Sequence, residues 1–141
     1  MDGAHPHLLF NHFPIIGSIL SAIILIAGIL LKNETVKKTA LGLAAFTAIM
    51  TIPAFLTGEG AEEALEAINQ APDAIIHEHE ELGETALWTT LVVGAISLFS
   101  LFRLNSSIGK KLVTASLVLM IANSIFLAKV GNEGGMIRHT E

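Results

Sequence analysis

The sequence contains no cysteine, few aromatic residues (6%) and few charged ones (15%). Without cysteine the chain forms no disulfide, no thiolate metal site, no iron–sulfur cluster and no covalently attached haem. Its basic residues are dispersed and its formal net charge is −5, which argues against nucleic-acid binding. The low aromatic content offers no sign of a transport path for small molecules.

Apolar residues are abundant instead: they make up 52% of the chain, and the mean hydropathy is +0.64. A helix needs roughly 17–25 mostly apolar residues to cross a bilayer. The first apolar run is longer than a signal-peptide core and follows a segment without Lys or Arg, so we expect it to be a spanning helix. The sequence predicts one all-α domain over residues 1–141, an integral membrane four-helix bundle. Its expected spans are about 8–31, 40–56, 84–104 and 111–128, with an outer loop at 57–83.

The basic residues cluster in two short loops. Lys32, Lys37 and Lys38 lie between the first two spans, and Arg103, Lys110 and Lys111 lie between the last two. Short loops rich in Lys and Arg stay in the cytoplasm. We therefore expect two out–in–out hairpins in a lipid bilayer, with both termini and the 57–83 loop on the periplasmic or outer side.

All six histidines fall on this outer side. His5, His7 and His12 precede or open the first span, His77 and His79 open the third, and His139 follows the fourth. The first and third spans run parallel, which puts His12 and His79 at similar depth. Ionisable groups at membrane depth are costly and commonly functional, so this end of the bundle is the expected site.

Helical spacing separates the two histidines of the third span. At about 100° per residue, His77 and His79 point to different sides of the helix. His79 shares its face with small residues, the kind that line membrane-helix interfaces: Gly83, Ala86, Thr90, Val93 and Ser97. His77 shares its face with residues typical of the lipid and headgroup surface, among them Glu81, Trp88 and Phe99. His79 is predicted to point into the bundle, and His77 is not.

Three local features shape the outer end. AEEALEAI, residues 61–68, predicts a short amphipathic helix after a break at Gly58 and Gly60, and the third long helix is expected to begin near Asp73. Either Pro6 opens the first helix and Pro14 kinks it, or that helix begins near Phe13. Gly131, Gly134 and Gly135 predict a turn that folds Arg138 and His139 back over the bundle.

Four short segments carry a resemblance to a known family: HPHLLFNHFP, TGEGAEE, HEELGETALW and GGMIRH. With them the chain resembles small bacterial four-helix membrane proteins grouped as a domain of unknown function. The resemblance implies the bacterial inner membrane, redox biology, and a partner such as cytochrome c or a respiratory complex. By motif, the histidines of the family correspond to His5, His12, His79 and His139. Asn11 departs from the apolar residue that many relatives have, and the resemblance implies no reaction.

The leading hypothesis is a b-type haem held near the outer face by His12 and His79. Gly83 would lie against the ring, and Arg138 and His139 would cap the propionates. Two imidazole ligands leave no open iron position, which favours electron transfer over catalysis and leaves enzymatic activity undecided.

Two alternatives stay open. One is a zinc, copper or iron ion bound by His12, His79 and His139, with His5 or Glu62 completing the site. The other is a structural subunit of a respiratory or other membrane complex, in which the histidines only form hydrogen bonds. A homodimer is compatible with each hypothesis.

Overall fold

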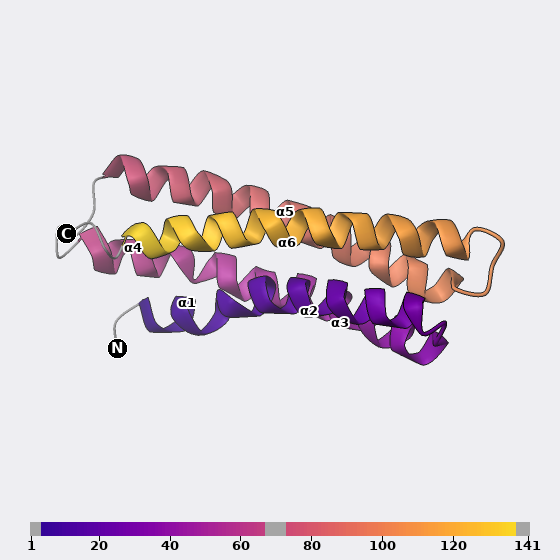
Figure 1. Cartoon of the computed structure of the whole chain (residues 1–141). Helices are drawn as coiled ribbons and strands as arrows, with labels where there is room; N and C mark the ends of the chain where they lie inside the picture. Colours follow the sequence, from indigo (N-terminus) through magenta and orange to yellow (C-terminus); the bar gives the residue numbers. More distant parts are fainter. Residues whose placement is uncertain (1–3, 67–72, 138–141) are drawn as a thin grey trace.

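The computed structural model describes residues 4–66 and 73–137, which are helical almost throughout and include no strand (Figure 1). Four helical stretches are long and apolar enough to cross a membrane, judged by length and composition: His5–Leu30, Glu34–Leu56, Ile75–Arg103 and Gly109–Gly135. The predicted all-α membrane four-helix bundle is therefore confirmed. The helices are α1 Ala4–Phe10, α2 His12–Leu30, α3 Glu34–Leu56, α4 Gly58–Glu66, α5 Asp73–Arg103 and α6 Gly109–Ile137.

The four long helices form a ring in which α2 packs on α3, α3 on α5, α5 on α6, and α6 on α2. Because α2 and α5 are not neighbours in this ring, they lie diagonally across the bundle. The start of α1, the end of α6 and all of α4 lie at one end, here called the terminal end (Figure 1). The α2–α3 and α5–α6 turns lie at the opposite end, here called the basic end because Lys32, Lys37, Lys38, Arg103, Lys110 and Lys111 gather there.

The interior is built mainly from small side chains, and many large apolar ones face outward. Leu25, Leu41 and Met120 fill the core between Ala22, Ala40 and Ala44. A Cβ atom on Gly94 of α5 would collide with Ala48 of α3, so these two helices touch almost backbone to backbone. Outward-facing residues such as Ile23, Ile49 and Ile125 are more than half exposed. Small residues inside and large apolar ones outside are typical of helices that pack within lipid.

A buried amide group ties three helices together at mid-bundle. The Asn123 side chain of α6 donates to Thr90 Oγ1 of α5 at 3.1 Å and to Ser18 Oγ of α2 at 3.4 Å. The Thr90 hydroxyl lies 3.3 Å from Asn123 Oδ1. These hydrogen bonds satisfy the polar side-chain groups inside the bundle, where water does not replace them.

The first span consists of two helices that follow each other with one residue between them. Helix α1 ends at Phe10, Asn11 donates its backbone N–H to the His7 carbonyl at 2.9 Å, and α2 begins at His12. Pro6 and Pro14 each lie in the first turn of a helix, where their missing N–H costs no hydrogen bond. Each predicted alternative is therefore borne out in part: Pro6 opens a helix, and a helix begins within one residue of Phe13 with Pro14 in its first turn.

The predicted turn at the chain's carboxyl end was wrong. Helix α6 continues through Gly131, Gly134 and Gly135 to Ile137. Gly131 and Gly134 serve close packing: a Cβ atom there would meet Ile15 of α2 at 2.7 Å and His79 of α5 at 2.8 Å, respectively. The predicted helix break at Gly60 was also wrong, because Gly60 lies within α4, which begins at Gly58.

Candidate functional site

His79 lies on the inner side of α5, near the terminal end. The face that it shares with Ala86, Thr90 and Val93 is buried, as its small residues predict. Gly134 of α6 approaches the ring so closely that an added Cβ would lie 3.1 Å from Nε2. The ring atom Nδ1 is buried and has no hydrogen-bond partner among the described residues. His79 therefore brings an unused ring nitrogen into the bundle.

His77 points away from the bundle, also as predicted. Its side chain is 72% exposed, and its ring nitrogens lie 3.3 Å from Glu80 Oε2 and 3.6 Å from Glu81 Oε1. Exposed ion pairs within one helix contribute little to stability. His77 is thus part of the charged outer surface of α5.

His7 of α1 is partly buried and fixed to the end of α3. Its Nδ1 lies 3.0 Å from the Ala54 carbonyl oxygen, which also accepts from the Thr57 hydroxyl at 3.1 Å. Carbonyls in the last turn of a helix lack partners within the helix, so they are free to accept from side chains. A carbonyl oxygen only accepts, so Nδ1 carries the hydrogen of a neutral ring. His7 Nε2 is left with a lone pair.

Two further side chains lie at the same end, so that three helices and the α1–α2 junction contribute to one group. Glu133 of α6 pairs with Lys129 through Oε1 at 3.3 Å, while its Oε2 is buried without a partner. Both His7 and Glu133 lie within electrostatic reach of the His79 ring. Asn11, between α1 and α2, also has a buried side-chain oxygen without a partner. We call His7, Asn11, His79 and Glu133 the terminal-end cluster.

The position of Asn11 follows from the packing of α2 on α6. Ile15 of α2 fills the space over Gly131 of α6. The two helices run in opposite directions, so one turn toward the terminal end brings Asn11 level with Gly135. Gly135 adjoins Gly134, which touches the His79 ring. Asn11 and His79 therefore approach α6 at the same height.

The unsatisfied atoms mark this cluster chemically. A buried polar atom without a hydrogen bond costs about 1–3 kcal/mol, and such atoms are rare in native proteins. Within residues 4–66 and 73–137, the buried side-chain atoms that lack a partner are Asn11 Oδ1, His79 Nδ1 and Glu133 Oε2. All three belong to the terminal-end cluster, so this is where a ligand would gain most.

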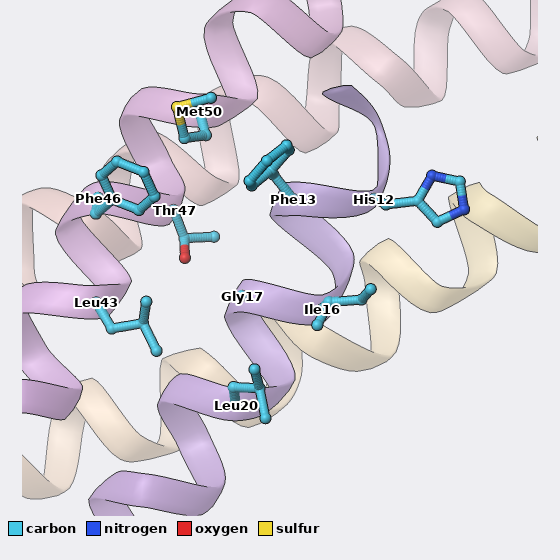
Figure 2. A pocket seen from close by; sticks show the side chains of 9 residues that line it. All are labelled: His12, Phe13, Ile16, Gly17, Leu20, Leu43, Phe46, Thr47 and Met50. Carbon is cyan, nitrogen blue, oxygen red and sulfur yellow. The ribbon is translucent and has the colours of Figure 1, made fainter. Parts of the chain in front are cut away.

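His12 lies apart from this group. Its ring is exposed, and its Nδ1 donates to the Leu8 carbonyl of the preceding turn at 2.9 Å. It stands at the rim of an apolar groove of about 360 Å³ between α2 and α3, with its ring directed away from Phe13 and Phe46 (Figure 2). The structure thus brings His7, rather than His12, into the surroundings of His79.

Of the other predicted site residues, His5 and Gly83 are described by the structure, and the side chains of the rest are not. His5 is exposed on α1. Gly83 lies one helical turn from His79, and a Cβ atom there would meet nothing within 4 Å. Arg138, His139 and the side chain of Glu62 lie outside the described residues. Across the described part of the chain, no three His, Asp or Glu side chains gather closely enough to hold a metal ion.

Comparison with known proteins adds no assignment: no family model, no curated protein and no solved structure matches this chain. The resemblance to small bacterial redox-associated membrane proteins therefore stays a prediction.

Proposed function

We propose that this protein is an electron-transfer protein of the membrane that binds one haem b at the terminal end, with His7 and His79 as axial ligands. One observation carries the proposal: two imidazoles from helices distant in sequence, α1 and α5, come within electrostatic reach of each other in a partly buried site. His7 replaces the predicted ligand His12, whose ring is exposed and bonded to its own helix.

The hydrogen bonding of the two rings supports this role. Metal-binding histidines commonly donate their second ring N–H to a carbonyl, which fixes the ring and the free nitrogen. His7 has such a bond to Ala54, so its Nε2 is available for coordination. His79 has a buried Nδ1 without a partner. Each ring therefore offers one nitrogen, and bis-imidazole haem needs two.

The neighbouring helix surfaces support a flat ligand. Gly83 of α5 and Gly135 of α6 have no atom within 4 Å of the position that a Cβ would take. Small residues let flat groups and backbones approach each other closely within a bundle. When bound, haem would supply one-electron redox chemistry. The chain would supply both axial ligands and so leave no open coordination position on the iron.

We propose the bacterial inner membrane as the location, with the terminal end on the periplasmic side. The six cations of the basic end support this orientation, since Lys and Arg in short loops favour the cytoplasm. A haem there would exchange electrons with a periplasmic carrier such as cytochrome c or with a respiratory complex.

A single zinc, copper or iron ion is a second candidate, which the three unpartnered atoms of the terminal-end cluster favour. An imidazole nitrogen, a carboxylate oxygen and an amide oxygen form a donor set that suits these metals. His79, Glu133 and Asn11 would then be the ligands, in place of the predicted His12 and Glu62.

An absorption spectrum and metal analysis of one purified preparation test both candidates. For haem we expect a Soret band that His7→Ala and His79→Ala each reduce at least tenfold, because one axial ligand is lost. His12→Ala, which removes an exposed imidazole from the same end, is the matched control and keeps the band. Loss of the band in His12→Ala alone would contradict the assignment of His7.

A bound ion would give a different result. Stoichiometric metal without porphyrin absorbance, lost in Glu133→Gln and Asn11→Ala, would establish the second candidate and overturn the first. A folded protein with neither haem nor metal would leave the structural-subunit hypothesis.

A further inference from the structure

The basic end carries far more positive than negative charge. Six of the eight Lys and Arg residues lie there, against one carboxylate, Glu34. Glu34 is already engaged: its Oε1 lies 2.7 Å from Lys38 Nζ and accepts from the Asn105 amide at 3.2 Å. Lys110 and Lys111, at the start of α6, form no ion pair with any described residue. Their charges are available to an anion from outside the chain.

From these two lysines toward the terminal end, the side chains on the outer face of α6 change from charged to small to apolar. Lys110, Lys111, Thr114 and Ala115 border a shallow, open depression of about 440 Å³. Farther along the same face, Val118, Ile121 and Ile125 are exposed by 60%, 41% and 69%. Together with Thr114, these residues follow Lys111 at intervals of three and four, so they form one stripe along the helix. The order is cations, then small residues, then apolar side chains.

The apolar part of the stripe covers much of one lipid leaflet. Val118 and Ile125 are separated by seven residues, which is about 10 Å along a helix. Half the hydrocarbon thickness of a bilayer is about 15 Å. An acyl chain that starts at the lysines would therefore lie against these apolar side chains over about two thirds of the leaflet.

We propose that this face of α6 binds one anionic phospholipid, with its phosphate between Lys110 and Lys111 and an acyl chain along Val118, Ile121 and Ile125. The depression at Thr114 and Ala115 would take the glycerol region, where bulkier side chains would not leave room. Phosphatidylglycerol fits this charge pattern, since its headgroup is anionic, whereas phosphatidylcholine has no net charge. The binding is independent of any cofactor at the terminal end.

Native mass spectrometry of the detergent-solubilised protein with equal amounts of the two lipids tests the proposal. Each lysine near an anionic lipid surface contributes about fivefold in binding. We expect the wild-type protein to retain phosphatidylglycerol over phosphatidylcholine by at least about fivefold. The double variant Lys110→Gln/Lys111→Gln should lose this preference, because its two phosphate contacts are gone.

The matched control removes the same charge from the other turn of the basic end. Lys32→Asn/Lys37→Gln should keep the preference, with Asn chosen because Lys32 has a φ of 52°. An equal loss in both double variants would overturn the proposal, since it would indicate diffuse attraction without a site. Displacement of the lipid by an equal concentration of inorganic phosphate would also overturn it, because the apolar stripe would then add nothing to the binding of the phosphate. Circular dichroism of each variant checks that the helices are intact.

Discussion

The Asn123 side chain forms hydrogen bonds with two neighbouring helices. It reaches Thr90 of α5 and Ser18 of α2 from its place on α6, at a depth where water is excluded. Asparagine is costly in a lipid-facing position but useful between helices, where its two donors and its oxygen join several partners at once. Its role is to fix which face of α6 turns inward.

Asn123→Ala should therefore destabilise the bundle. Hydrogen bonds between membrane helices contribute about 0.6–2 kcal/mol, and the variant also leaves Thr90 without its partner. We expect a lower unfolding temperature in detergent, measured by circular dichroism. Asn132→Ala, on the exposed side of the same helix, should leave that temperature unchanged. An equal effect of both substitutions would mean that the buried amide has no special part in packing.

Sequence periodicity was sufficient for some residues of the site and insufficient for others. The small residues that follow His79 at helical spacing predicted its inward orientation, because one helix face is a local property. The burial of His7 depends on the docking of α1 against the end of α3, which no local pattern encodes. Glu133 was missed because its glycine-rich surroundings predicted a turn. Its i,i+4 spacing from Lys129, a pairing typical of helices, was an available sign that α6 continues.

Close contact between α3 and α5 is the element-level feature on which the ring arrangement depends. Gly94 meets Ala48 and the Ala44 carbonyl of α3, so the backbones themselves limit the distance. The span positions followed from composition. The pairing of α3 with α5 did not, because hairpin connectivity alone leaves open which hairpin faces meet.

We expect Gly94→Ala to push these two helices apart. The new methyl group would overlap Ala48 Cβ, which has no rotatable bond to move aside. Overpacking of this kind costs about 1–3 kcal/mol, and thermal unfolding in detergent would measure it. Gly42→Ala in α3 is the control: its Cβ position is open, and alanine favours helix by up to about 1 kcal/mol. A Gly94→Ala variant as stable as Gly42→Ala would contradict the close contact.

At the scale of the whole molecule, charge is distributed unequally between the two ends, and we expect this to set the orientation in the membrane. Cations gather at the α2–α3 and α5–α6 turns, whereas Glu34 is the single acidic residue in the sequence of those two turns and the helix ends beside them. The sequence predicts this arrangement directly, since loop charge is read without any tertiary contact.

The absence of cysteine makes the orientation straightforward to measure. Ser107→Cys in the α5–α6 turn and Asn132→Cys near the terminal end are both exposed positions. In intact bacterial cells whose outer membrane has been made permeable, a membrane-impermeant thiol reagent should label the second variant. It should label the first only after lysis. The reverse pattern would place the terminal end in the cytoplasm and the proposed haem with it.

The terminal end holds α1, the end of α6 and the unpartnered imidazole of His79 together (Figure 1). A polyhistidine purification tag on either end of the chain would thus bring six foreign imidazoles within reach of the site under assay. Such a tag would itself bind nickel or haem, and the absorption spectrum and metal analysis would then report a signal that does not come from the site. An affinity tag inserted in the 104–108 turn, at the opposite end of the bundle, would avoid this interference with the absorption spectrum.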